Sequence, residues 1–293
     1  MQRLCFRPAW LALLVVAVAS LATSGAALAA RIGVLSNKYW SETAQDFNSH
    51  IPQHTFTGVD IGGGAPPLAQ LLAQFDAVLL FEDGTFVLAP SVGNTVAAFA
   101  RSGHAVVLGT FYDQERSDGS LDFTPHGWGD LENIDPNTTD GVGTSYAART
   151  LGTLVPHPLT TGITSLSAAK FAGGNQAKQG TVVVANWAQK NALGNPDPAI
   201  DYRITSQACV IHVTVAPNYP TVATSSADFG GDFYRAWRNA FDFGAAHCSI
   251  GPFAAPGDVV AIPAVSTPLL AALASLLAGL AALTLHRVRA RAR

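Results

Sequence analysis

Short apolar runs alternate with amphipathic stretches through the first half of the chain, and these runs predict buried strands. The predicted strands span residues 31–36, 55–61, 76–81 and 104–109. The predicted helices between them span residues 41–50, 68–75 and 91–102. This alternation of strand and helix predicts a mostly parallel sheet with helices on both faces. We expect segments 32–35, 77–81 and 105–108 to be neighbouring strands.

The second half is less regular. The segment from Asp113 to Gly143 is polar and rich in Gly, Asp and Pro. A loop of that length is either functional or an ornament of the fold. Strands are predicted at 181–185 and 209–215, and the alternation of polar and apolar residues in the latter indicates an antiparallel edge. Aromatic side chains interleaved along 233–246 predict a closing helix.

The first 30 residues have the order of a secretory signal peptide. Arg3 and Arg7 precede an apolar stretch, and a small-x-small pattern ends at Ala29. Cleavage is expected near Ala29 or Ala30, which would send the chain out through the export machinery. The alternative is an uncleaved membrane anchor.

The last residues predict a second membrane-directed segment. Residues 250–263 are a linker, and the Leu- and Ala-rich run from Ala264 to Leu285 is long enough to cross a bilayer. Arginines follow at once, and such clusters stay on the cytoplasmic side. Residues 264–293 are therefore predicted to span the membrane once, with the body outside. The alternative is a buried core helix.

The motif Ile262-Pro263, the apolar run and terminal arginines such as Arg287 and Arg289 resemble the C-terminal sorting segments of the PEP-CTERM type. The nearest variant, IPTL-CTERM, opens with Ile-Pro-Thr-Leu, whereas this chain continues with Ala264-Val265. The resemblance implies an envelope protein handled by a membrane protease of the exosortase or rhombosortase kind. It implies a location at the cytoplasmic membrane facing the periplasm, or at the cell surface after processing.

Charge and cysteine content narrow the function classes. Six of the 17 Lys and Arg residues lie in the two end segments, so the body holds 11 basic against 20 acidic residues, a net charge of −9. An acidic body argues against nucleic acid as a partner. Cys209 and Cys248 are the only cysteines left after cleavage, and in an exported chain they suit a disulfide. The alternative is two buried thiols.

Three segments give residues 31–249 a family likeness. The order strand, Gly84, helix and Val106-Val107-Leu108-Gly109 resembles the class I glutamine amidotransferase-like fold. The segments His157–Ile163 and Gly180–Trp187 are similar to the trehalose-utilisation-type branch of that fold. The resemblance implies a flavodoxin-like, three-layer α/β domain. True amidotransferases carry a nucleophilic Cys at a strand-to-helix elbow, and here Thr110-Phe111 follows the strand, so the expected reaction is lost.

Open parallel sheets bind ligands beyond the carboxyl ends of their strands. That rule selects ligand-binding candidates Ser36, Asn37, Asp83 and Tyr112. The same rule selects Glu82 and Asp113, which with His157 from a later loop could perform acid–base chemistry. The alternatives are a solvated turn at 82–84 and a plain loop histidine at 157. No metal-ligand spacing or phosphate loop is found, so no cofactor is expected.

The sequence therefore supports an exported, membrane-anchored or surface-sorted protein whose domain binds a glycan, a small molecule or another envelope component without catalysis. An extracellular carbohydrate-active hydrolase or isomerase that uses Glu82, Asp113 and His157 is the alternative. A structural part of an extracellular matrix is a third interpretation. A close approach of those three side chains would favour the enzyme.

Overall fold

The computed structural model describes residues 29–84, 86, 88–112, 127–206, 208–222 and 228–248. The predicted signal peptide, linker and sorting segment lie outside these residues, apart from the last positions of the signal peptide, and so does Asp113. Within the described ranges, no helix is both long enough and apolar enough to cross a bilayer.

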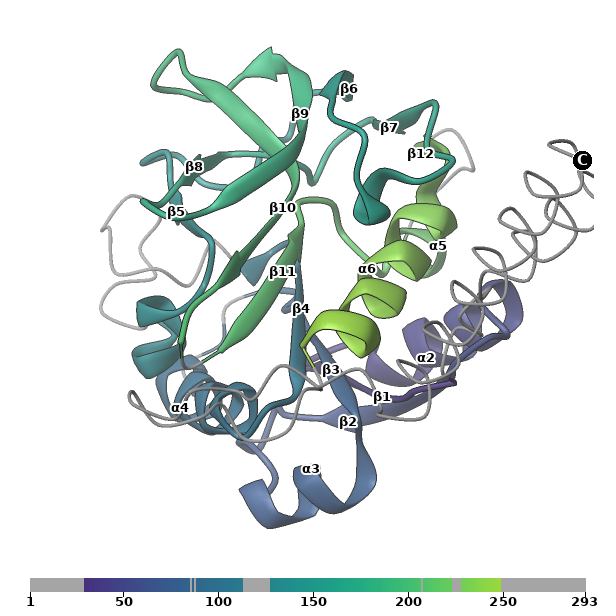
Figure 1. The fold of residues 1–293 in the computed structure, drawn as a ribbon, viewed down its shortest axis with the longest axis vertical. Helices are drawn as coiled ribbons and strands as arrows, with labels where there is room; N and C mark the ends of the chain where they lie inside the picture. The colour runs from purple at the N-terminus through teal and green to yellow at the C-terminus, as the bar shows by residue number, and fades with distance from the viewer. Residues whose placement is uncertain are drawn as a thin grey trace, which may run out of the picture. The chain divides into compact units, whose positions relative to one another are not determined.

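Five parallel strands form one half of a ten-stranded sheet (Figure 1). They are β1 (Arg31–Ser36), β2 (Thr55–Asp60), β3 (Ala77–Leu80), β4 (Ala105–Gly109) and β11 (Cys209–Val213). Their order is β2-β1-β3-β4-β11, and every neighbouring pair among them is parallel. This is the strand order of flavodoxin-like folds. The predicted adjacency of β1, β3 and β4 is confirmed, as is the flavodoxin-like α/β class of this half.

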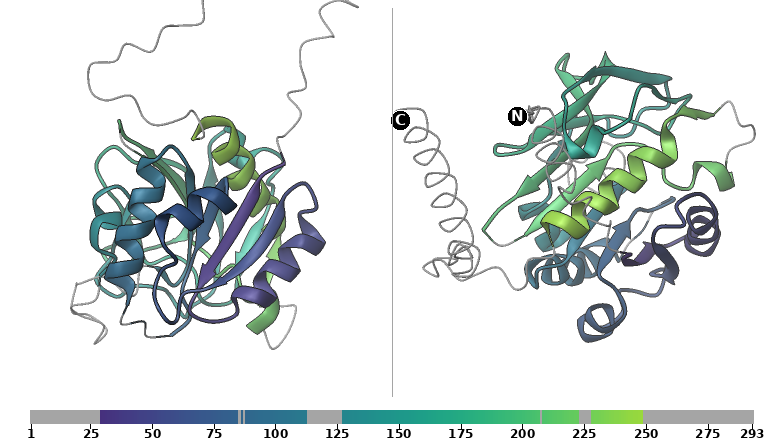
Figure 2. Two further views of the ribbon diagram at one scale, coloured as in Figure 1. Left: turned by 90° about the horizontal axis from the view of Figure 1, so that it is seen from below. Right: turned by 45° about the vertical axis from the view of Figure 1, so that its right-hand side comes forward.

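Helices cover both faces of the parallel half (Figure 2). They are α2 (Trp40–His50), α3 (Leu68–Gln74), α4 (Ala89–Arg101) and α6 (Phe233–His247). Phe47 of α2 and Trp237 of α6 pack with Val107 on one face, and Val96 of α4 packs with Leu108 on the other. Val107 and Leu108 are neighbours in β4 and pack into cores on opposite faces of the sheet, which is why these strands are apolar on both faces.

Beyond β11 the sheet continues through five antiparallel strands. They are β10 (Pro196–Ile204), β9 (Val182–Lys190), β6 (Arg149–Leu154), β7 (Leu166–Ala168) and β12 (Phe229–Gly231), in that order from β11. The prediction that 209–215 forms an antiparallel edge is wrong. β11 lies in the middle of the sheet, parallel to β4 and antiparallel to β10, and all its residues are buried.

Short elements complete the described part of the chain. They are the 3₁₀ helices η2 (Gly129–Asn133) and η3 (Pro158–Thr160), the helix α5 (Tyr219–Val222), and a two-stranded sheet of β5 (Asn137–Thr139) and β8 (Asn175–Ala177). The described portion of the predicted 113–143 loop therefore contains both η2 and β5. Polar residues of this portion contact segments distant in sequence, as Asp135 does with Lys178 and Asn137 with Asp201.

Cys209 and Cys248 form a disulfide, as predicted, with their Cα atoms 5.4 Å apart. Cys209 begins β11, and Cys248 is the C-cap residue of α6. Both residues are fully buried. The bond therefore joins the closing helix to the central strand on which that helix packs.

Candidate functional site

The carboxyl ends of β1 and β3 bring several of the predicted residues together. The side chain of Asn37 accepts a hydrogen bond from the Asp83 amide (2.8 Å) and donates one to the Asp83 carbonyl (3.2 Å). Ser36 is fully buried beside Asn37 and accepts a hydrogen bond from the Lys38 amide (3.3 Å). Asn37 thus braces the turn after β3.

The remaining carboxyl-end residues also take part in internal contacts. The Asp83 carboxylate accepts a hydrogen bond from the side chain of Asn218 (2.8 Å), and Glu82 is almost fully buried next to it. The Tyr112 hydroxyl donates to Asp135 (2.7 Å), and its ring stacks on Trp128. Tyr112 thereby belongs to the packed core on the α4 face.

The sequence predicts that His157 and Glu82 share one candidate site. The structure does not place the two residues together. The His157 ring lies against Phe243 in the last turns of α6, and Nδ1 accepts from the Leu159 amide (3.2 Å). That end of α6 is bonded through Cys248 to the start of β11. Glu82, in contrast, follows the end of β3, and β3, β4 and β11 run in one direction.

The surroundings of His157 suit a structural role. Its side chain caps η3, where Thr160 reciprocates by accepting from the His157 amide (3.0 Å). Burial lowers the pKa of His157, and the neighbouring His247 lowers it further. The ring stacks on Tyr202, with ring centroids 5.2 Å apart. A pocket of about 540 Å³ borders His157 and the neighbouring residues of η3.

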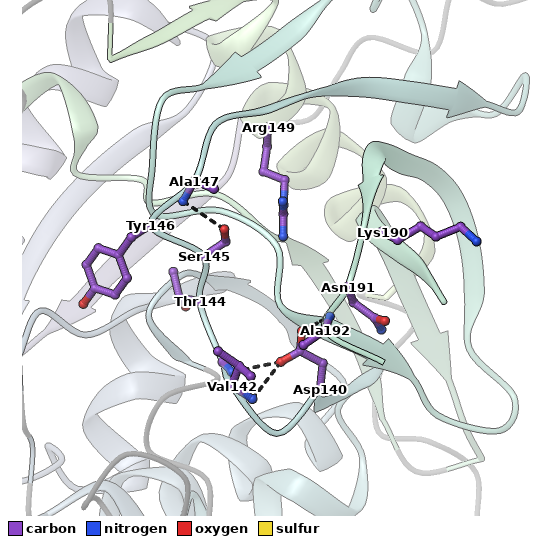
Figure 3. Close-up of a pocket in the computed structure, with 11 residues that line it drawn as sticks. Asp140, Val142, Thr144, Ser145, Tyr146, Ala147, Arg149, Lys190, Asn191 and Ala192 are labelled. Carbon is purple, nitrogen blue, oxygen red and sulfur yellow. Dashed lines mark hydrogen bonds between the residues drawn. The ribbon is translucent and has the colours of Figure 1, made fainter. Parts of the chain in front are cut away.

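A second pocket, of about 420 Å³, lies in the antiparallel half and was not predicted from the sequence (Figure 3). We call it the Arg149 pocket. Its walls come from two segments that are distant in sequence. The lining residues are Asp140, Val142, Gly143, Thr144, Ser145, Tyr146, Ala147, Arg149, Lys190, Asn191 and Ala192.

Asp140 joins the two walls of the Arg149 pocket. One carboxylate oxygen accepts from the amides of Val142 and Gly143, both at 2.9 Å. The other accepts from the amide of Ala192 at 2.7 Å. Three backbone amides therefore hold Asp140, so this carboxylate shapes the pocket and has little accepting capacity left for a ligand.

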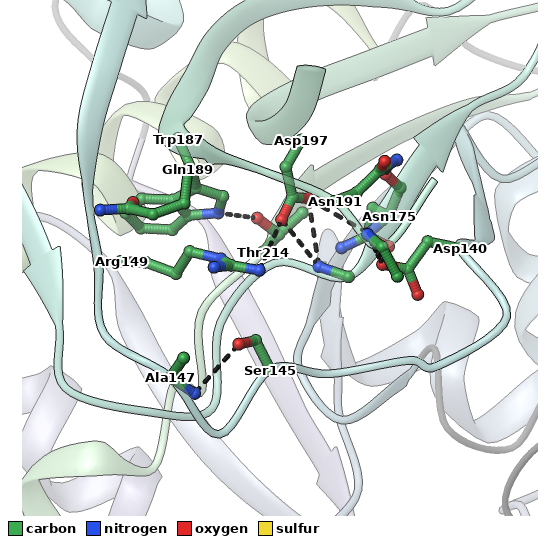
Figure 4. A network of polar contacts seen from close by, with 12 residues as sticks. Asp140, Ser145, Ala147, Arg149, Asn175, Trp187, Gln189, Asn191, Asp197 and Thr214 are labelled. Atoms are coloured by element: carbon green, nitrogen blue, oxygen red, sulfur yellow. Dashed lines mark hydrogen bonds and ion pairs between the residues drawn. The ribbon is translucent and has the colours of Figure 1, made fainter. Parts of the chain in front are cut away.

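Behind the pocket lies a buried ion pair (Figure 4). Nη2 of Arg149 is 3.3 Å from Oδ2 of Asp197, whose side chain is fully buried. Asp197 also accepts from the amides of Gly174 (3.0 Å) and Asn175 (3.1 Å). Burial raises the pKa of Asp197 to about 6, although these amides and Arg149 all act to lower it.

Several buried polar groups here lack partners among the described residues. Arg149 has only 8% of its surface exposed, and the described part of the chain offers its guanidinium the Asp197 ion pair but no hydrogen bond. The hydroxyl of Thr144, also a lining residue, has no hydrogen-bond partner there, nor does the side-chain amide of Asn175. Most buried polar groups in proteins are hydrogen-bonded, so such a set indicates a place where a ligand or water supplies the partners.

No family model and no curated protein matches the chain. Among solved structures, it is similar to a putative ThuA-like protein from Bacteroides uniformis, with a TM-score of 0.42, 9% identity, and coverage of 76% of this chain and 94% of the other. It is also similar to Agd3, a carbohydrate deacetylase, with a TM-score of 0.42 and 11% identity. That match covers 74% of this chain but only 33% of the deacetylase.

Proposed function

We propose that the chain is an exported protein, membrane-anchored or surface-sorted by its C-terminal segment, and that its α/β domain binds a glycan in the Arg149 pocket without catalysis. The two ends of the sequence support the location. Arg3, Arg7 and the apolar stretch after them support export, and the Ala264–Leu285 run with its arginines supports retention.

One observation carries the binding role, namely the buried guanidinium of Arg149 at the pocket wall with no hydrogen bond from the described residues. A guanidinium offers five N–H donors, and leaving them unpaired costs stability. A sugar presents closely spaced oxygen acceptors, which suit such a donor set. The volume of about 420 Å³ also falls within the usual range for small-molecule sites.

The positions of Glu82 and His157 count against the alternative enzyme. A hydrolase or isomerase built on Glu82, Asp113 and His157 needs all three in one pocket. His157 lies against the end of α6 near the Cys209–Cys248 bond, at the opposite end of the parallel strands from Glu82. Acid–base catalysis requires its partners within hydrogen-bond reach of one substrate.

The test is binding of the full-length protein, purified in detergent, to an array of immobilised neutral and uronate-containing oligosaccharides. Ala192 is an exposed lining residue, and Ala192→Trp would fill the pocket while leaving the backbone amide that holds Asp140. Ala73→Trp is the matched control, because Ala73 is exposed on α3 in the parallel half. Binding that Ala192→Trp abolishes and Ala73→Trp preserves supports the proposal. No binding, or binding indifferent to Ala192→Trp, overturns it.

A further inference from the structure

We infer that the Arg149 pocket selects an acidic sugar, with the guanidinium of Arg149 pairing with the ligand's carboxylate. This inference rests on the proposed glycan-binding function and adds the charge class of the ligand. Three features of the pocket lead to it, namely the geometry of Arg149, the engagement of the nearby carboxylates, and the charge at the rim.

The first feature is the way Arg149 is held. β6 begins at Arg149, and the side chain is nine-tenths buried between Asp197 and the pocket (Figure 4). Among the described residues, the ionic partner of the guanidinium is Asp197, 3.3 Å from Nη2. The planar guanidinium fork fits a two-oxygen anion in a bidentate manner, which makes Arg a common partner of carboxylates. A single ion pair leaves part of this fork available to a ligand.

The second feature is that the two acidic residues around the pocket do not compete strongly for the ligand's place. Both oxygens of Asp140 accept backbone amides of the pocket walls. Asp197 lies behind Arg149 with a fully buried side chain, and its oxygens accept amides of Gly174 and Asn175. Backbone amides thus offset part of the negative charge of both carboxylates, and the lining groups that can pair with a bound anion are Arg149 and Lys190.

The third feature is the rim. Lys190, exposed at the end of β9, lines the mouth with its ammonium directed away from Arg149 (Figure 3). It adds a positive charge on the approach to the pocket. The buried hydroxyl of Thr144, behind the pocket wall, has no hydrogen-bond partner in the described residues. With Arg149 and Lys190 against Asp140, the lining carries a net charge of +1 on a body of net charge −9, which favours an anionic ligand over a neutral one at this location.

The experiment uses matched probes that differ only in charge. Galacturonate and glucuronate trimers, and the methyl esters of both, are titrated calorimetrically into the full-length protein in detergent. The acid of at least one pair is expected to bind tenfold or more tightly than its ester. Equal affinities for acid and ester overturn the acidic assignment, while binding sensitive to Ala192→Trp keeps the proposed function. A phosphorylated trisaccharide that binds more tightly than both acids overturns the carboxylate assignment.

Substitutions of Arg149 and Lys190 test which cation causes the preference for the acid over its ester. Arg149→Lys keeps the charge that Asp197 needs but removes the fork, so the acid should bind about tenfold more weakly while the protein stays folded. Lys190→Gln, at an exposed position, should weaken the acid several-fold at low salt and leave the ester unchanged. Arg101→Gln, which loses only a surface pair with Asp130, is the control. Unchanged acid binding in Arg149→Lys, or failure of both acids to bind at all, contradicts the inference.

Discussion

The carboxylate of Asp197 lies 3.3 Å from the guanidinium of Arg149, and yet its pKa is raised to about 6. Burial is the largest cause, and it outweighs the ion pair and two backbone amides that favour the ionised form. The folded protein therefore holds a proton on Asp197 at pH values where an unfolded chain, with a pKa near 3.8, has released it.

This difference predicts a pH dependence of stability. Between about pH 4 and 6 the folded state binds more protons at Asp197 than the unfolded state does, so stability falls as the pH rises. The contribution of Asp197 to the free energy of unfolding is fully present below its pKa in the unfolded chain. It is lost as the pH rises through its pKa in the folded protein. The shift from 3.8 to about 6 corresponds to at most about 3 kcal/mol. Urea denaturation at pH 4, 5, 6 and 7 measures it.

Asp197→Asn is the reference for this group, because an amide at position 197 does not titrate. The free energy of unfolding of the wild type, relative to Asp197→Asn, should drop by up to about 3 kcal/mol from pH 4 to 7. A difference that is flat over this range, or that rises with pH, would show that Asp197 does not hold its proton in the folded state.

Gly174 and Gly141 provide a second, paired prediction. Both have φ of +88°, so a side chain carries the same backbone cost at either position. A Cβ at Gly174 would lie 1.9 Å from the carbonyl oxygen of Gly143 in the pocket wall, whereas a Cβ at Gly141 meets nothing within 4 Å. Gly141→Ala should cost about 1 kcal/mol. Gly174→Ala should cost more than twice that and weaken ligand binding, because the wall must move.

Thermal unfolding and ligand titration of the two variants side by side test this. Equal losses of stability in both would mean that only the backbone conformation matters. In that case the close approach of the two chain segments at Gly143 and Gly174 would not be needed to hold the Arg149 pocket in shape.

The parallel half of the fold could be predicted from sequence because its strands are short, apolar and separated by helices. The same reasoning failed at β11, where polar residues suggested an edge. His212 in β11 and Thr214 just after it are buried because remote residues supply their partners. Asn137 lies 3.0 Å from Nδ1 of His212, and the Trp187 indole donates to the Thr214 hydroxyl (2.8 Å). A local pattern cannot report such partners.

The candidate site shows the same limit. The bracing of Asp83 by Asn37 follows from topology, since the carboxyl ends of neighbouring parallel strands must meet. Arg149 and Asp197 belong to β6 and β10, and β9 lies between these strands in the sheet. No spacing or motif connects them. The nearest sequence signal of this pocket is the Gly- and Asp-rich segment that ends at Gly143, because a loop of that length is either functional or an ornament of the fold.

The Cys209–Cys248 disulfide predicts a measurable contribution to stability. The bond closes a loop of 39 residues, and restricting that loop in the unfolded chain is worth about 4 kcal/mol by the chain-entropy estimate. Replacing both cysteines by alanine should lower the free energy of unfolding by roughly that amount. Denaturation of the wild type with and without reductant is the control, and a reduced wild type as stable as the oxidised one would contradict the prediction.

The last prediction concerns the C-terminal segment, which lies outside the described residues. The apolar run from Ala264 to Leu285 is favourable in lipid, and the four arginines after it resist crossing the bilayer. Neither half suffices alone, because an apolar run without the arginines could pass through and the arginines without the run would retain nothing. Deleting residues 264–293 should therefore release the domain in soluble form after export.

Cell fractionation of the wild type, the 264–293 deletion and a shorter deletion of residues 286–293 separates the two contributions. Mass spectrometry of the N-terminus tests whether the signal peptide is removed near Ala29 or Ala30, as expected. The full deletion should appear in the soluble extracytoplasmic fraction, and the shorter one should be only partly retained. If the fully deleted and N-terminally cleaved protein still sediments with membranes, another anchor holds it. The assignment of residues 264–293 as the retaining segment would then fail.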